Sequence, residues 1–285
     1  MDSIVTMISR IVPSEVERVA GSLGNETIEH ASRCFRGDGA LIVENIVDTA
    51  IITEARCKFS ESYSGYLDGF DHDDALTVGD LRLTITIDLE PPFDNLQLFA
   101  NSYLLPVLSA ALDDDFVIGA YGVVCSLPSA PAQHRHCDGG TLFPLSGIDR
   151  VLPAAAITVG IPLIEMNDVH GTTALWLGTH RDVNRSNALR DPSRSEDFKE
   201  ESIEPIVREG SCILWDFRLV HGGTPNRGTV PRPLLYLTYC RPWFFDHKNF
   251  NTKKNPKQRP LLCRADFLSG LSAQQQRLLA RAQAR

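Results

Sequence analysis

The sequence predicts a mostly β fold with flanking helices, built on a double-stranded β-helix of the jelly-roll or cupin-like kind. From Phe116 onward, short strand-like runs dominate the chain. Gly and Pro turns separate these runs, and such spacing is typical of an antiparallel double sheet. Histidine and carboxylate side chains also fall at predicted strand ends, which favours a jelly roll. The runs are FVIGAYGVVCSL, AAAITVGIPLI, TALWL, SIEPIV, SCILWDFRLV and RPLLYLTYC.

The part of the chain before this core is expected to begin with two helices around a strand. Asn25 is expected to cap a helix over 26–36, because apolar and small residues fall on one face there. ALIVENIV (40–47) is apolar enough for a buried strand. Asp48 is expected to cap a second helix that runs to about Tyr66.

An aspartate-rich loop over 67–80 follows, interpreted either as a solvated loop or as a lid that meets a cationic substrate. LRLTITIDL (81–89) alternates apolar and polar side chains, which predicts a half-buried strand. A long helix is predicted from about Asp94 to Leu112, with a broad apolar face toward the core. After the strand-rich part, ADFLSGLSAQQQRLLARAQAR is expected to form a helix or a frayed tail.

The domain organisation is expected to be simple. No linker, internal repeat or low-complexity tract interrupts the 285 residues, and double-sheet β folds of this length often form one domain. We therefore expect a single domain over 1–285. It would comprise a helical part to about residue 115, a jelly-roll core over about 116–243 and a C-terminal tail or helix over 244–285.

The charge balance is acidic. The 36 Asp and Glu residues outnumber the 28 Lys and Arg residues, which gives a net charge of −8. This excess argues against nucleic acid and anionic membrane as partners. It also disfavours a coenzyme A thioester as substrate, because its phosphates usually need basic side chains. The one basic cluster, Lys248–Arg259, is interpreted as solvated surface.

Cysteine usage and apolar patterning indicate the compartment. Seven scattered cysteines without a Cys-x-x-Cys pair fit reduced thiols, not disulfides or a zinc knuckle. The sequence starts without the basic segment and apolar core of a signal peptide, and no apolar run approaches the roughly 18 residues of a membrane span. We expect a cytoplasmic monomer or homodimer whose partner is a small molecule.

A candidate metal-binding motif lies in the segment Gln133–Gly140. In an extended segment, residues i and i+2 point to the same face, so His136 and Asp138 can reach one metal ion. His221 lies in SCILWDFRLVHGG, a predicted strand that runs into a Gly-Gly turn. Two histidines and one carboxylate form the facial triad of non-haem Fe(II) oxygenases. His134 shares the parity of His136, so a His134–His136 pair is the alternative ligand set.

Arg232 adds a second chemical signal. It opens RPLLYLTYC, an apolar run with strand character, eleven residues after His221. A buried arginine needs an anionic partner, because an unpaired buried charge is very costly. Its planar fork suits a carboxylate held by two parallel hydrogen bonds. A dicarboxylic keto acid that chelates iron through one end would present its other carboxylate to such a group.

Taken together, these residues resemble the phytanoyl-CoA dioxygenase family of Fe(II)/2-oxoglutarate oxygenases. GTTALWLGTH (171–180) and EGSCILWDFRLVHGG are similar to further segments of that family, so the resemblance spans roughly residues 120–243. It implies that His136, Asp138 and His221 bind Fe(II) and that Arg232 binds 2-oxoglutarate. It also implies contacts from Gln133 and Thr173 to the cosubstrate.

The resemblance implies a function as well. A member of this family would use O2 and convert 2-oxoglutarate to succinate and CO2 while it hydroxylates or otherwise oxidises a small organic substrate, here in natural-product biosynthesis. Related halogenases replace the ligand carboxylate by a small residue, so Asp138 favours oxidation. Two alternatives are a non-catalytic jelly roll that binds metal or ligand, and a cupin-type metalloenzyme independent of 2-oxoglutarate.

Four side chains are candidates for the substrate pocket, each with a simpler interpretation beside it. Arg218 could contact substrate or succinate, or could hold Asp216. Trp215 could form a wall of the pocket or belong to the core. His134 could lie beside the ligands or at the surface. Phe244 could bind an apolar substrate or cover a sheet edge.

Overall fold

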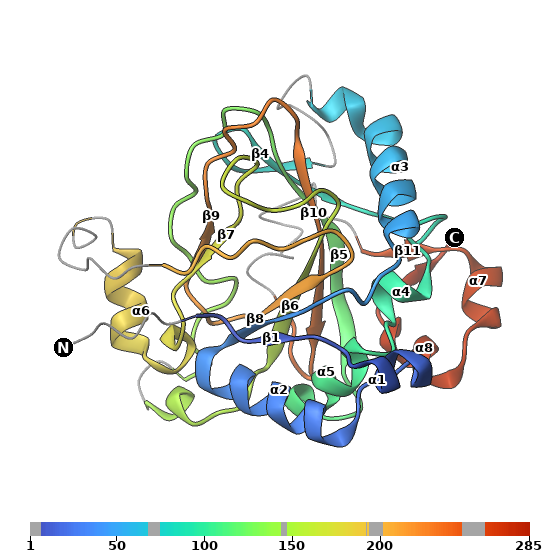
Figure 1. Cartoon of the computed structure of the whole chain (residues 1–285), viewed down its shortest axis with the longest axis horizontal. Coiled ribbons are helices and arrows are strands. Elements are labelled where there is room, and N and C mark those ends of the chain that lie inside the picture. Colours follow the sequence, from blue (N-terminus) through green and yellow to red (C-terminus); the bar gives the residue numbers. More distant parts are fainter. Residues whose placement is uncertain (1–6, 68–74, 144–146, 192, 194–201, 247–259) are drawn as a thin grey trace.

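A computed structural model gives the fold and describes residues 7–67, 75–143, 147–191, 193, 202–246 and 260–285 (Figure 1). Two segments discussed above lie largely or wholly outside these residues. They are the aspartates of the 67–80 loop, namely Asp68, Asp71, Asp73 and Asp74, and the basic cluster Lys248–Arg259. Within the described part of the chain, no helix combines the length and apolar character needed to cross a bilayer.

The main sheet has eight strands in the order β1-β2-β8-β6-β10-β5-β4-β3. Its pairs are antiparallel except for β1 and β2, which run parallel. The strands are β1 (Arg10–Ile11), β2 (Ala40–Val43), β3 (Ala75–Gly79), β4 (Arg82–Thr86), β5 (Val117–Ser126), β6 (Ala156–Pro162), β8 (Cys212–Asp216) and β10 (Arg232–Cys240). The apolar runs predicted as strands at 40–47, 81–89 and 116–127 correspond to β2, β4 and β5.

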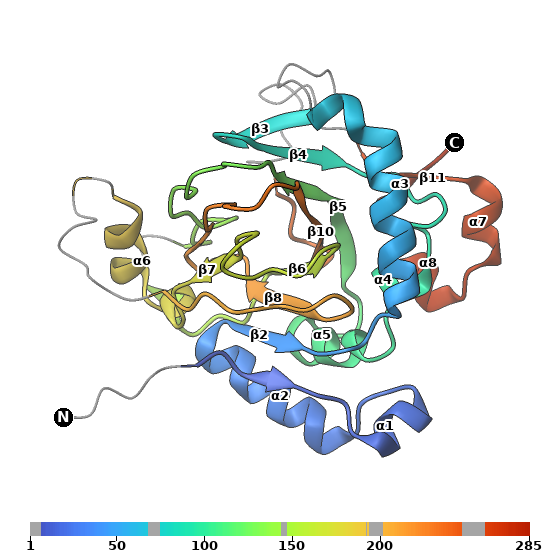
Figure 2. The ribbon, with the colours of Figure 1, turned by 45° about the horizontal axis from the view of Figure 1, so that its top comes forward.

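A small second sheet pairs β7 (Thr173–Leu175) with β9 (His221–Gly223). An antiparallel bridge between His136 and His221 adds the predicted motif segment to its edge. In Figure 1, β7 and β9 lie on one side of β10 and β5, while α3 (Thr49–Leu67) and α4 (Leu96–Phe99) lie on the other. Figure 2 shows the same arrangement for β7, α3 and α4. The two sheets form the double sheet that the turn spacing predicts.

The two faces of the main sheet differ in what covers them. Alternate residues such as Val159 and Leu237 pack into the large core with Phe35 of α2 (Asn25–Asp38) and Leu108 of α5 (Leu104–Leu112). The other face, which we call the inner face, points toward β7 and β9. It carries the intervening residues of each strand, among them Thr158, because side chains alternate along a strand. Trp215 and Arg232, two of the predicted site residues, lie on this face.

The helix predicted over 94–112 is divided into α4 and α5, so the prediction of one long helix is wrong. Asn101 lies at the break and is 3 % exposed. Its amide nitrogen donates to the carbonyls of Ile46 (2.8 Å) and Gln97 (3.0 Å), and its oxygen accepts from the Tyr103 backbone (3.0 Å). A side chain that bonds neighbouring backbone groups competes with the helical pattern. The buried amide therefore stabilises the turn between the helices.

Three further expectations are corrected in detail. The segment 67–80 is not a loop throughout, because Ala75–Gly79 forms β3 and pairs with β4. Gly24 is the N-cap of α2 and Asn25 is its first residue, a shift of one position. SIEPIV does not form a strand; it contributes only isolated bridges through Ile203 and Val207. Pro205 lies between these two residues and has no N–H to donate to a ladder.

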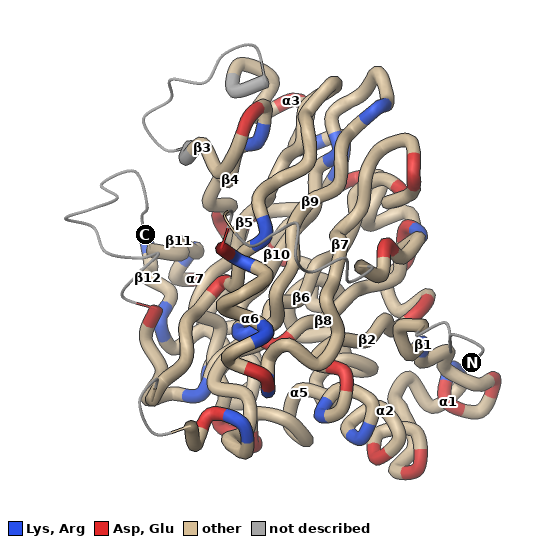
Figure 3. Tube along the Cα trace, turned by 90° about the vertical axis from the view of Figure 1, so that its left-hand side faces the viewer, with Lys and Arg blue, Asp and Glu red and all other residues tan. Residues whose placement is uncertain are grey.

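The remaining elements are short. The C-terminal segment predicted as helix or tail forms α7 (Ala265–Gly270) and α8 (Ala273–Leu278), and then β12 (Gln283–Ala284), which pairs in parallel with β11 (Leu262–Cys263). The others are α1 (Glu15–Ala20), η1 (Ile148–Arg150), η2 (Thr179–Arg181) and α6 (Val183–Arg190). Figure 3 shows acidic and basic positions interspersed over the face that carries β7, β9 and α6.

Candidate metal centre

Two histidine rings lie side by side because their backbones are paired across the small sheet. The His136 N–H donates to the His221 carbonyl (2.9 Å), and the His221 N–H donates to the His136 carbonyl (2.8 Å). The ring centroids are 4.3 Å apart. Each Nδ1 lies 3.0 Å from a nearby carbonyl, that of His134 or Leu219. A hydrogen on Nδ1 satisfies that carbonyl and leaves Nε2 free to bind a metal.

The Asp138 carboxylate is held through one of its oxygens. Thr158 Oγ1 (2.8 Å) and Trp215 Nε1 (3.0 Å) both donate to Oδ2. The other oxygen, Oδ1, lies 3.5 Å from His221 Nε2. Thr158 and Trp215 are themselves cross-strand partners on β6 and β8, so the main sheet fixes their spacing. We call these two donors the Asp138 clamp, because they hold Oδ2 and leave Oδ1 facing the histidines.

The three side chains form one potential ligand set. One donor atom from each of His136, Asp138 and His221 lies within 4.8 Å of the others. Burial, together with the neighbouring His221, lowers the pKa of His136 to about 4, so its imidazole is neutral at physiological pH. Burial alone would raise the pKa of Asp138, but both histidines and Thr158 lower it well below its usual range. Two imidazoles and an ionised carboxylate are the donor set of a non-haem Fe(II) centre.

The Asp138 clamp gives a first testable expectation. Thr158→Val or Trp215→Phe removes one donor to Oδ2, so the carboxylate can rotate away from the position in which Oδ1 faces the histidines. Loss of such a supporting contact typically costs about 10- to 100-fold in metal affinity. We expect that loss in anaerobic Fe(II) titrations of either variant. Thr53→Val is the control, because the exposed Thr53 hydroxyl bonds only the Thr49 carbonyl of its own helix. Unchanged iron affinity in both clamp variants would contradict the role.

Arg232 lies at the start of β10 and is 2 % exposed. Among the described residues it forms no ion pair; Nη1 contacts Met166 Sδ at 3.4 Å, and Nε has no hydrogen-bond partner. Burial, with a contribution from nearby Arg82, lowers its pKa to about 10, so the guanidinium stays charged at neutral pH. A buried cation without an acid is costly, and this geometry fits an anionic ligand.

A second buried arginine, Arg82, was missed by the sequence reasoning. Arg82 of β4 and Arg232 of β10 both pair with Ser126 of β5, so the three side chains form a row across the inner face. The Nη groups of Arg82 donate to the carbonyls of Pro131 and Thr224. Its Nε and the Ser126 hydroxyl are buried without partners among the described residues. An anion bound at this row would meet two guanidinium groups and a hydroxyl.

The sequence contained only a weak signal for Arg82. LRLTITIDL alternates, so Arg82, Thr84 and Thr86 form its polar side. The polar side of an alternating strand normally faces water. Here the small sheet and the loops around it cover that side, and Arg82 is 1 % exposed. Only the tertiary arrangement shows whether the polar side of such a strand faces water or is covered by other segments.

The two other predicted cosubstrate residues lie next to this row. The Gln133 amide donates to the Val78 carbonyl (2.8 Å) and accepts from the Gly223 N–H (3.1 Å), so it joins β3 to β9. Thr173 is the cross-strand partner of Gly223. A Cβ at Gly223 would lie 3.1 Å from Arg82 Nε. Thr173 therefore shares the face that meets the arginines.

Three of the four substrate-pocket candidates lie near the ligand set or line the cavity on the inner face of β5 and β10. Trp215 contacts Asp138 as described. The exposed His134 has its ring 5.2 Å from that of His136. Phe244 lines a cavity of about 250 Å³ on the inner face of β5 and β10.

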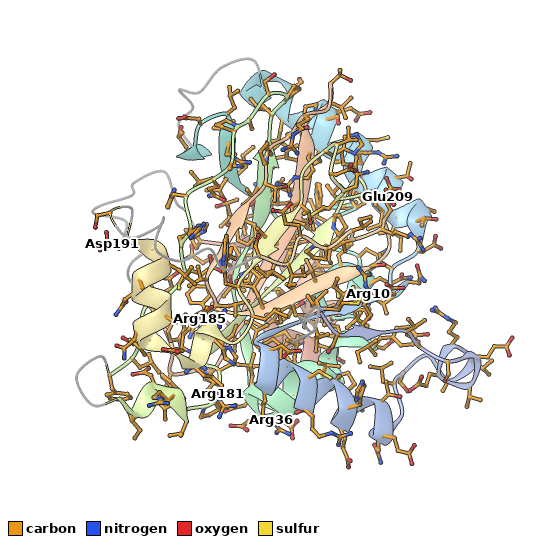
Figure 4. The ribbon with its side chains drawn as sticks, turned by 60° about the vertical axis from the view of Figure 1, so that its left-hand side comes forward. Arg10, Arg36, Arg181, Arg185, Asp191 and Glu209 are labelled. Carbon is orange, nitrogen blue, oxygen red and sulfur yellow. The ribbon has the colours of Figure 1, made fainter. Side chains whose placement is uncertain are left out.

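Arg218 occupies a different environment. Its guanidinium forms a two-point contact with Asp216 (Nε–Oδ1 2.9 Å, Nη2–Oδ2 2.8 Å) and also donates to two backbone carbonyls. It lines a separate cavity of about 370 Å³ together with Arg36 and Arg181, which lie next to each other at the lower edge of Figure 4. Of the two interpretations offered for Arg218, the geometry favours the contact with Asp216.

The double sheet, the His-x-Asp…His cluster on its inner side and the buried arginine fit a non-haem iron centre beside a site for an anionic cosubstrate. Comparison with known families specifies the group. The profile of the Phytanoyl-CoA dioxygenase (PhyH) family matches residues 35–234, and the chain belongs to that family.

Individual proteins are similar to the chain as well. The chain is 24 % identical over 230 residues to "Dioxygenase FrzG" of Cladobotryum sp, covering 74 % of this chain and 72 % of that protein. The epimerase SnoN of nogalamycin biosynthesis, solved with Fe3+, α-ketoglutarate and nogalamycin RO, superimposes with a TM-score of 0.56 at 15 % identity (76 % and 85 % coverage). The carbocyclase SnoK of the same biosynthesis gives 0.56 at 16 % identity (77 % and 84 %). These structures confirm the predicted fold class.

Proposed function

We propose that this PhyH-family protein oxidises a small organic substrate, of the kind made in natural-product biosynthesis, at an iron held by His136, Asp138 and His221. The observation that carries the proposal is the buried guanidinium of Arg232, which has no acidic partner among the residues that the structure describes and lies on the same inner face as the ligand set. A bound iron ion by itself would not explain why a positively charged guanidinium is buried here. A dicarboxylic cosubstrate does, because its second carboxylate would neutralise the guanidinium.

Each side chain has an assigned task in this proposal. When bound, iron, 2-oxoglutarate and O2 supply the oxidising chemistry and yield succinate and CO2. His136 and His221 would provide Nε2 and Asp138 would provide Oδ1, which leaves the remaining positions to cosubstrate and oxygen. Arg232 would bind the far carboxylate of 2-oxoglutarate.

The neighbours of these residues would orient the cosubstrate. Arg82 and Ser126 would add charge and a hydroxyl beside Arg232, because each has a polar atom in the same row without a partner among the described residues. Gln133 would act by fixing β9 against β3, and Thr173 by facing the arginines from β7. The protein's work is thus orientation and exclusion of water.

The natural-product context rests on similar proteins. SnoN and SnoK both belong to nogalamycin biosynthesis, and their folds superimpose on this one. The net charge of −8 also makes a phosphate-bearing substrate unfavourable. Asp138 favours hydroxylation or a related oxidation over halogenation, since the carboxylate occupies a position on the metal.

One experiment separates this proposal from its two alternatives. Fe(II) and 2-oxoglutarate are titrated anaerobically, and succinate is then measured after oxygen is admitted. We expect binding of both, followed by slow succinate release even without substrate. A non-catalytic jelly roll would bind without releasing succinate, whereas a cupin-type enzyme would bind iron but not 2-oxoglutarate. Screening with compounds made by the products of neighbouring genes would then identify the substrate.

A further inference from the structure

The cavity of about 250 Å³ lies where the inner face of β5 and β10 meets the C-terminal segment. The strands contribute Ala120, Tyr236 and Thr238 to its wall, and the C-terminal part contributes Phe244, Phe245 and Arg281. None of these residues belongs to the ligand set or to the arginine row. The cavity is therefore distinct from the expected iron and 2-oxoglutarate positions.

Two routes of contact join the cavity to Asp138. Thr158, which donates to Asp138, is the cross-strand partner of Thr238 in the cavity wall. On the other side, a Cβ at Gly139 would lie 2.5 Å from the Phe217 ring, and Phe217 packs edge-on against Phe244 with ring centroids 5.7 Å apart. Through Thr158 and through Phe217, the cavity is thus connected to the carboxylate that would bind iron.

The strands contribute hydroxyl groups to the polar part of the lining. The Thr238 hydroxyl makes no hydrogen bond to the described residues. Thr84 Oγ1 donates to Tyr236 Oη at 3.3 Å, so the phenol keeps its own hydrogen for another acceptor. Such groups can bond a hydroxyl or carbonyl of a ligand. They offer no charge to a carboxylate or phosphate.

Arg281, the arginine of the lining, is already engaged. Its Nη2 donates to the carbonyls of Pro242 (2.9 Å) and Phe244 (2.7 Å), and its Nη1 contacts Cys240 Sγ at 3.3 Å. Asp246 also lines the cavity. The described lining therefore provides hydroxyls and aromatic faces but no uncommitted cation.

We propose that this cavity receives the substrate, and that the part it holds is an uncharged ring bearing a hydroxyl or carbonyl group, not an acyl-CoA thioester. The inference rests on the proposed function. The volume is slightly below the roughly 300–1,000 Å³ of whole-ligand pockets, so the cavity takes one ring-sized part of a molecule. The remainder would extend toward the exposed Trp243 and Phe245, which are 64 % and 59 % exposed. Aromatic rings at such a mouth stack on planar ligands.

The test uses 2-naphthol as probe, with binding to metal-free protein followed by the probe's fluorescence. Ala120→Leu narrows the cavity from β5 and is expected to weaken 2-naphthol binding at least tenfold. Ala50→Leu is the matched control, because Ala50 is exposed on α3. We expect 2-naphthoate and octanoyl-CoA to displace 2-naphthol poorly. No binding to the natural protein, equal binding to Ala120→Leu, or efficient displacement by octanoyl-CoA would each overturn the proposal.

Thr238→Val provides a second, nearly isosteric variant in case Ala120→Leu misfolds. It should weaken 2-naphthol binding by roughly three- to tenfold, because one hydrogen bond to the ligand is lost. The binding of naphthalene, which has no hydroxyl, should stay unchanged. Equal losses for both probes would argue against the hydroxyl's role. Succinate release, measured separately with iron and 2-oxoglutarate, reports on the proposed function. If the protein binds 2-naphthol but releases no succinate, the proposed oxygenase function is wrong. If it releases succinate but does not bind 2-naphthol, the cavity assignment is wrong.

Discussion

Arg232→Leu is expected to raise the dissociation constant for 2-oxoglutarate by ten- to a hundredfold or more, with iron binding largely unchanged. Loss of a charge-assisted contact costs about 1.5–3 kcal/mol, and each 1.4 kcal/mol is about tenfold in affinity. Arg232→Lys should recover only part of the loss, because an ammonium cannot reproduce the planar fork. The measurement is an anaerobic titration of 2-oxoglutarate into iron-loaded protein.

The same variant separates a binding role from a structural role. Among the described residues Arg232 has no acid partner. Replacing a poorly compensated buried charge by an apolar side chain is commonly neutral or stabilising. The metal-free Leu variant should therefore unfold at the same temperature as the natural protein or higher. Arg33→Leu is the control, since Arg33 forms only an exposed pair with Glu29. Normal 2-oxoglutarate affinity in Arg232→Leu would refute the cosubstrate assignment.

His136→Ala, Asp138→Ala and His221→Ala are each expected to abolish turnover and reduce bound iron toward zero while the fold is retained. The reason is that a site with only two protein donors holds iron weakly and leaves it unoriented. Iron content after gel filtration and succinate release are the measurements. Asp138→Gly is a special case, because it opens a metal position: iron binding can survive while oxidation of the substrate is lost.

His170→Ala provides the matched control for these variants. His170 is also partly buried, but its Nδ1 lies 3.3 Å from the Glu165 carbonyl in a loop and it is not part of the ligand cluster. It should bind iron and release succinate like the natural protein. A triad variant that kept full iron stoichiometry and activity would remove that residue from the ligand set.

The candidate ligand set could be predicted because its signals are local. The i, i+2 spacing of His136 and Asp138 determines a shared face in any extended segment, and Arg232 stands out as a charge at the head of an apolar run. The division of the 94–112 helix was not predictable, because Asn101 acts through a carbonyl 55 residues away. Arg82 was missed for a similar reason: alternation shows which side of a strand is polar, but not what covers that side.

The two sets of functional residues are held in place by different means. His136 and His221 are spaced by main-chain hydrogen bonds across the small sheet, whereas the cavity is shaped by inner-face side chains such as Ala120 and Thr238. Side chains can be exchanged without disturbing a backbone ladder. Laboratory evolution could therefore vary the cavity positions to change substrate preference and keep the iron centre constant. The architecture separates the parts of an oxygenase that must stay fixed from those free to diversify.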